Sequence, residues 1–143
     1  MIWKANRAKG YYATKFENIN LDFNEASKTI TKGIYSSTDS KSKLKLLLNY
    51  KFRIATASAI LSVLYPNDFS VYDYRVCEIL NDFSDISHLT NFDNIWNRYS
   101  KYLKVINETV PSKNNFREKD KSLWGQSFYN QLQFDIKNKF KKC

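Results

Sequence analysis

The fold is decided by residues 44–80, which read LKLLLNYKFRIATASAILSVLYPNDFSVYDYRVCEIL. A short apolar helix ends in a polar break at Asn49, and residues 54–64 then form a helix that is apolar on nearly every side. Such a helix belongs in the middle of a bundle, where other helices cover each face. Pro66 ends it, because a proline disfavours helical geometry in the preceding residue. The chain then approaches Asp73 in an extended form, and a third helix begins there.

Helical periodicity continues on both sides of this stretch. We expect a helix to begin at Asp22 and to end in the polar loop after Gly33, and another to begin at Thr90 and end at Pro111. The last helix places six apolar residues on one face: Leu123, Trp124, Phe128, Leu132, Ile136 and Phe140. No β-hairpin signal or internal repeat appears. The sequence therefore predicts an all-α fold, with residues 1–143 forming a single bundle of about six helices.

The composition excludes several classes of function. The chain has 143 residues, 43% of them hydrophobic, which suffices for one domain with a real core. One histidine and two cysteines cannot form the usual metal clusters or nucleophilic triads, and three glycines are too few for a phosphate-binding loop. No apolar run is long enough to cross a membrane. We expect no metal, no cofactor, no membrane association and a reduced cytoplasmic setting.

The net charge of +9 has two explanations. It would attract phosphate backbones and speed the encounter with nucleic acid. Alternatively, an AT-rich genome enriches Lys, Asn, Ile, Tyr and Phe together, as seen here. The first twenty residues also allow two interpretations, nucleic-acid binding or ordinary packing. Aromatic residues alternate with basic ones there: Trp3, Tyr11, Tyr12 and Phe16. We expect these rings to pack on the bundle while the lysines face water.

Asp73 is the residue best placed for chemistry, because carboxylate chemistry and binding are all that the composition leaves. Its simplest role is to cap the helix that follows it. The dipole of the same helix favours the charged carboxylate, and a fixed anion in a cleft can stabilise a developing cation or orient water.

Three segments of the central stretch resemble the helix-hairpin-helix core of the base-excision DNA glycosylases: residues 47–55 (LLNYKFRIA), 58–61 (SAIL) and 69–76 (FSVYDYRV). In that superfamily a glycine-rich hairpin contacts phosphate and leads into a buried helix, and a catalytic aspartate follows. The chain is similar, more closely still, to a group of uncharacterised bacterial proteins distantly related to these enzymes. The shared motifs are ASAIL, V-x-D-x-R, an N-terminal W-K-x-x-R (residues 3–7) and a C-terminal R-x-x-D-x-x-L-W (residues 117–124).

The resemblance implies a helix-hairpin-helix glycosylase-like fold and assigns roles to single residues. Asp73 takes the place of the catalytic aspartate, and Asn49, Tyr50, Lys51 and Arg53 take the place of the DNA-binding hairpin. Asn49 and Lys51 replace the usual glycines; asparagine tolerates a left-handed turn, whereas lysine seldom adopts one. Arg53 stands where bifunctional enzymes carry a Schiff-base lysine, and arginine cannot supply that nucleophile.

The sequence therefore predicts a DNA-binding protein, with monofunctional base excision as the activity that the resemblance implies. A base would be flipped into a pocket, where Tyr50, Tyr72 or Trp124 could stack on it, while Asp73 stabilises the sugar cation. The alternative is a catalytically inactive glycosylase-like module that binds nucleic acid or a protein. A third interpretation is an interaction module without any role in nucleic-acid binding. An ion pair between Arg53 and Asp73 would favour a structural site over an active one.

Overall fold

The computed structural model describes residues 10–12, 14, 16 and 22–140. Residues 22–140 contain six α-helices, one 3₁₀ helix and no strand, which confirms the all-α prediction for this part of the chain. The helices are α2 (Phe23–Ser36), α3 (Ser40–Asn49), α4 (Ile54–Leu64), α5 (Tyr74–Leu80), η1 (Ser84–His88), α6 (Phe92–Thr109) and α7 (Phe116–Lys137). The likeness to a glycosylase fold stays a prediction.

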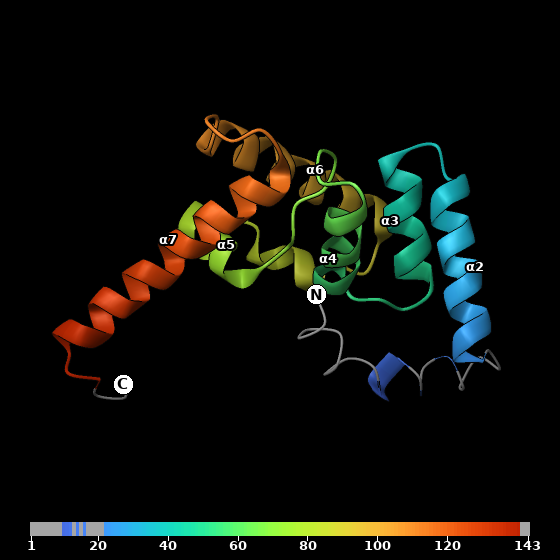
Figure 1. Cartoon of the computed structure of the whole chain (residues 1–143), viewed down its shortest axis with the longest axis horizontal. Helices are drawn as coiled ribbons and strands as arrows, with labels where there is room; N and C mark the ends of the chain where they lie inside the picture. Colours follow the sequence, from blue (N-terminus) through green and yellow to red (C-terminus); the bar gives the residue numbers. More distant parts are fainter. Residues whose placement is uncertain (1–9, 13, 15, 17–21, 141–143) are drawn as a thin grey trace.

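The helices form a body with one protruding arm (Figure 1). α2 and α3 lie side by side at one end, and α4 stands in the middle. α5 packs against the first part of α7 on the other side of α4, and α6 crosses behind them. The second part of α7 extends away from the body toward the C-terminus.

Short polar side chains fix where most helices begin, because each accepts a hydrogen bond from an N–H group of the first turn. Asp22 caps α2 in this way, as its position in the sequence predicts. The cap of α6 is Asn91, whose side chain accepts from the N–H of Asn94, and not Thr90 as predicted. Gly33 lies inside the last turn of α2, which continues to Ser36 and has Ser37 as its cap, so the helix ends in the polar run after Gly33 as predicted.

One hydrophobic cluster extends through the body from Tyr12 to Leu123. α4 contributes Ile54, Ala57 and Leu61 to it, as its apolar sequence predicts. Val63 and Leu64, however, are 42% and 45% exposed, so α4 is covered on most of its surface and not on every face.

The largest departure from the sequence prediction is in α7. The residues that α7 buries are Lys119, Leu123 and Ser127. The apolar residues expected to share a face with Leu123 are exposed, with exposed fractions from 38% to 68%: Trp124, Phe128, Leu132, Ile136 and Phe140. Leu123 faces the core, whereas Trp124, Phe128, Leu132 and Ile136 lie on sides of α7 that are turned away from it, since positions four apart shift gradually around a helix. The helix was expected to include Phe140, but α7 ends at Lys137 and Phe140 lies beyond it.

The N-terminal aromatic residues that the structure describes pack largely as expected. Tyr12 and Phe16 are buried, and the Tyr12 ring stacks on Phe52 with centroids 4.4 Å apart. Tyr11 is 42% exposed. The W-K-x-x-R motif, from Trp3 to Arg7, lies outside the described residues.

Candidate functional site

The hairpin between α3 and α4 ends α3 with two interlocked backbone hydrogen bonds. The N–H of Lys51 donates to the carbonyl of Leu48 at 2.9 Å, and the N–H of Phe52 donates to the carbonyl of Leu47 at 3.1 Å. This is a Schellman motif, in which the residue after the cap takes a left-handed conformation. Lys51 accordingly has a φ of 65°. The turn expected from the sequence therefore exists, without either of the glycines that would favour it.

The residue that adopts the left-handed conformation in this turn is not the one whose side chain tolerates it best. Asn49, which tolerates that conformation, remains the last residue of α3. Lys51 adopts it instead, at a cost of about 1–2 kcal/mol for a residue with a Cβ. The position of the turn is set by where the apolar residues of α3 meet the core, and this packing overrides the preference of the single residue.

The other hairpin residues differ in what they expose. Tyr50 is half-buried, and its ring meets the Phe16 ring edge-on at 6.5 Å, so it belongs largely to the core. Arg53 is exposed and is the N-cap residue of α4, but it makes no side-chain capping bond. Its guanidinium carbon lies 5.5 Å from the centre of the Tyr11 ring. Asn49, Lys51 and Arg53 thus present polar groups to solvent, and Tyr50 does so only in part.

Asp73 caps α5, as predicted. Its Oδ1 accepts the N–H of Arg75 at 3.0 Å. The chain leading to it is held by buried side chains: the Tyr102 hydroxyl donates to the carbonyl of Val71 at 2.7 Å, and Ser58 Oγ accepts the N–H of Tyr72 at 2.9 Å. Asp73 therefore projects from a firmly anchored loop and not from a loose one.

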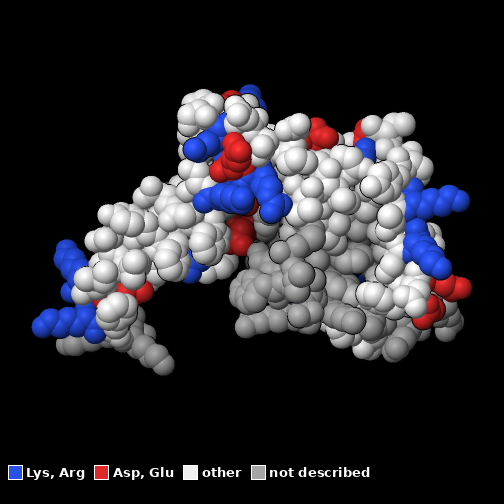
Figure 2. Space-filling view, viewed as in Figure 1, with Lys and Arg blue, Asp and Glu red and all other residues white. Residues whose placement is uncertain are grey.

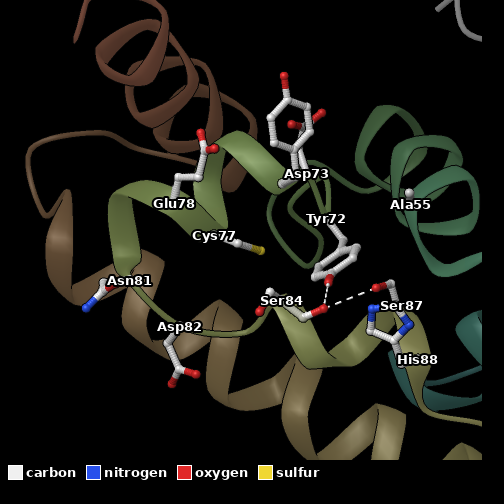
Figure 3. Close-up of a pocket in the computed structure, with 11 residues that line it drawn as sticks. Ala55, Tyr72, Asp73, Cys77, Glu78, Asn81, Asp82, Ser84, Ser87 and His88 are labelled. Carbon is white, nitrogen blue, oxygen red and sulfur yellow. Dashed lines mark hydrogen bonds between the residues drawn. The ribbon is translucent and has the colours of Figure 1, made fainter. Parts of the chain in front are cut away.

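A cavity of about 790 Å³ opens in front of Asp73 (Figure 3). Its size falls within the range of small-molecule sites, about 300–1,000 Å³. Three elements form its walls: the start of α4, the loop and helix around Asp73, and the segment that contains η1. The lining residues are Ala55, Tyr72, Asp73, Tyr74, Cys77, Glu78, Asn81, Asp82, Ser84, Ser87 and His88.

The lining of the cavity is acidic. Asp73, Glu78 and Asp82 contribute carboxyl groups, and no lysine or arginine is among the lining residues. Hydrogen bonds from Arg98 lower the pKa of Asp82, and the Arg98 Nη2 to Asp82 Oδ1 distance is 2.7 Å. Asp82 is therefore ionised at neutral pH. The aromatic residues beside Asp73 in this lining are Tyr72 and Tyr74.

The thiol and the phenol in the cavity wall are not activated for nucleophilic chemistry. Burial raises the pKa of the Cys77 thiol to about 11, so the thiol keeps its proton at neutral pH. Burial also raises the pKa of Tyr72, whose hydroxyl lies 3.0 Å from the carbonyl oxygen of Phe83 and 3.2 Å from that of Ser84. Carboxylate chemistry at Asp73 remains available in this cavity.

The sequence interpretation missed part of this wall. A lone histidine in a polar loop is usually an ordinary surface residue, yet His88 lies at the end of η1 and lines the cavity. No periodic pattern marks a five-residue 3₁₀ helix, so this element cannot be recognised in the sequence. Cys77 was detectable in principle, because a residue four positions after Asp73 lies on the same side of the helix.

The described part of the chain offers neither a metal site nor a membrane-spanning helix. Within residues 10–12, 14, 16 and 22–140, no group of three or more His, Cys, Asp or Glu side chains could hold a metal ion. Among the same residues, no helix is long and apolar enough to cross a membrane.

Comparison of the chain with protein-family models, with curated proteins and with solved structures finds no match. None of these comparisons bears on the resemblance to helix-hairpin-helix glycosylases, which stays a prediction from the sequence motifs.

Proposed function

We propose that this chain binds DNA through residues 49–53 and that the cavity at Asp73 receives a nucleobase for excision. One observation supports the proposal: the segment that follows the hairpin and the loop at Asp73 line the same cavity. Ala55, two residues after Arg53 in the hairpin, lines the same cavity as Asp73. A nucleotide whose phosphate rests on the hairpin would thus have its base and sugar next to the carboxylate.

Phosphate contact would come from two groups on the hairpin. The side chains of Lys51 and Arg53 are exposed and positively charged. The N-terminus of α4 adds the partial positive charge of its first N–H groups, which no cap side chain satisfies. The turn amides of Lys51 and Phe52 already donate within the hairpin, so they are not part of this contact.

The excision chemistry follows from the charge inside the cavity. As the bond from a base to its sugar breaks, its electron pair leaves with the base, and a nearby carboxylate stabilises the positive charge that remains on the sugar. Water then adds to the sugar carbon and loses a proton, which completes the exchange. Asp73 is held in place by its capping bond to Arg75. Glu78 adds a carboxyl group to the same cavity, whereas the carboxylate of Asp82 is paired with Arg98 at 2.7 Å.

The charge of the cavity lining also selects the substrate. A cavity whose lining includes the carboxyl groups of Asp73 and Glu78 and no lysine or arginine disfavours phosphate and favours a positively charged base. A purine alkylated on a ring nitrogen carries such a charge, and the ring of Tyr72 offers a π face to it. We therefore propose alkylated purines as the substrate class.

The test has two parts. Binding to a short duplex is measured by fluorescence anisotropy across a salt series, and affinity should fall steeply as salt rises. Excision is measured on duplexes that contain 7-methylguanine or uracil, with release expected for the methylated base. Asp73→Asn should abolish release and leave the duplex affinity nearly unchanged, because asparagine also caps helices. Absence of salt-dependent binding would refute the DNA-binding proposal and favour an interaction module.

A catalytically inactive module that binds nucleic acid is the second candidate. The capping bond from the Arg75 N–H to Asp73 favours it, because this bond gives the carboxylate a structural role. Salt-dependent binding without release of any base, in the native chain and in Asp73→Asn alike, would establish this alternative.

A further inference from the structure

The protruding part of α7 carries a row of exposed apolar side chains. Trp124, Phe128, Leu132 and Ile136 follow one another at intervals of four residues, so they form one ridge along the helix. They are 43%, 49%, 38% and 53% exposed, and the rings of Trp124 and Phe128 stack at 5.6 Å. Together with Tyr129, which is 57% exposed, they define what we call the α7 ridge.

The arm that carries the ridge lacks internal support. Beyond Ser127 no residue of α7 is buried, and Figure 1 shows this part extending clear of the other helices. Helical segments this short are marginal in water unless one face packs against something. The five ridge side chains leave on the order of 500 Å² exposed, at the upper end of the patches found on monomers. The ridge therefore has the properties of a surface that another molecule covers.

The charge pattern restricts what that molecule can be. From Trp124 to Phe134 the helix has no charged residue, and in Figure 2 the arm is white over most of its length. Nucleic acid or an acidic peptide would require cations there. A membrane-surface helix would need lysine or arginine on its polar side, which instead carries Gln126, Asn130 and Gln133. Depletion of charge at exposed apolar positions is typical of the core of a protein–protein interface.

Gly125 is an independent indication of close contact. A glycine inside a helix costs about 1 kcal/mol relative to alanine. A Cβ at this position would meet no atom within 4 Å, so packing within the chain does not require the glycine. Gly125 adjoins Trp124 and lies one turn before Tyr129, within the ridge. The missing side chain leaves a depression where a second helix backbone can approach closely.

We infer that the α7 ridge is the interface of a homodimer, in which two copies of α7 cross near Gly125. A two-fold axis through this crossing pairs the ridge with itself, and rows at four-residue intervals interdigitate when helices cross at about 50°. Two ridges would bury about 1,000 Å² between them, which reaches the lower limit for a specific interface. The ridge side chains themselves carry no charge, and the nearby guanidinium of Arg75 lies over the Trp124 ring, 5.8 Å from its centre.

Sedimentation equilibrium of the full chain over a wide concentration range tests the inference. The native chain should approach twice the monomer mass, and Leu132→Asp should raise the dissociation constant at least ~10-fold. Tyr35→Glu is the matched control, since Tyr35 is an equally large exposed residue, 74% exposed, on α2. This control should leave the dissociation constant unchanged. A native chain that stays monomeric at every concentration would overturn the inference.

Gly125→Ala separates dimer packing from helix stability. In the native background it should weaken association about 10-fold, because the new methyl group blocks the crossing. Combined with Leu132→Asp, where the chain is monomeric, the same change should raise the thermal midpoint, because alanine favours the helix. Tighter association of Gly125→Ala in the native background would refute a crossing at this glycine.

Discussion

The Tyr99 hydroxyl donates a hydrogen bond to the carbonyl of Ser70, with an oxygen–oxygen distance of 2.5 Å. Both residues are fully buried, and 29 positions separate them in the sequence. Tyr102 makes the same kind of bond to Val71, one residue further along the loop. α6 therefore holds the loop that leads to Asp73 through two phenol groups, and this anchoring is the basis of the first two predictions.

Tyr99→Phe should destabilise the fold by about 1–3 kcal/mol, because it leaves a buried carbonyl without a donor. Urea unfolding followed by circular dichroism measures the loss. Tyr35→Phe removes a hydroxyl from an exposed ring and should change the free energy of unfolding by less than ~0.5 kcal/mol. Equal effects of the two variants would show that the bond to Ser70 contributes nothing.

Stability should fall at alkaline pH. Burial raises the pKa of Tyr99 and Tyr102 above the ordinary value of 10.0, and raises that of Cys77 from 9.0 to about 11. Above about pH 9–10 these groups lose protons in the unfolded chain while the folded chain retains them, so rising pH favours unfolding. Urea midpoints across this range should decrease, and less steeply in Tyr99→Phe than in the native chain. A midpoint that does not change up to pH 11 would contradict the prediction.

The capping role of Asp73 can be measured apart from any catalysis. Asp73→Ala should cost about 1 kcal/mol of folding stability, since the N–H of Arg75 loses its acceptor. Asp73→Asn should cost less, because an asparagine oxygen can accept the same bond. Thermal or urea unfolding of the two variants measures both losses. Equal free energies of unfolding for Asp73→Ala and Asp73→Asn would contradict the capping role.

Lys51→Gly should stabilise the fold by about 1 kcal/mol, because glycine adopts the left-handed conformation without a steric penalty. Lys51→Ala removes the same charge and retains the penalty, so it serves as the control for unfolding measurements. If the hairpin binds DNA, both variants should reduce the slope of log affinity against log salt by about 1, as expected for one lost phosphate contact. Unequal slopes would mean that the backbone, and not the charge, governs binding.

Local chemical signals made much of the fold predictable. The apolar rhythm of α6 and the aspartate caps of α2 and α5 are visible in the sequence, because they depend on near neighbours. The α7 ridge was not predictable as a surface. A row such as Trp124, Phe128 and Leu132 has the same spacing whether a neighbour covers it or not, and the sequence does not state which face receives one.

Part of the candidate site could likewise be predicted from the sequence, and part of it could not. Asp73 could be located from the sequence, because a polar residue between an extended segment and a helix is a recognisable cap. The cavity in front of it could not, since η1 supplies Ser84, Ser87 and His88 without any periodic signal. The left-handed Lys51 was also unexpected, because tertiary packing and not residue preference selects it.

The contact between Tyr12 and the hairpin affects the order in which the protein folds. Two of the amides in the turn, those of Lys51 and Phe52, bind carbonyls of α3 only a few residues away, so they can form as soon as the helix does. The amide of Arg53 instead meets the Tyr12 hydroxyl at 3.4 Å, across 41 residues. Closing so long a loop is slow compared with forming local bonds. The helix pair should therefore assemble early, and the turn should reach its final rigidity in a late step, when the segment around Tyr12 docks.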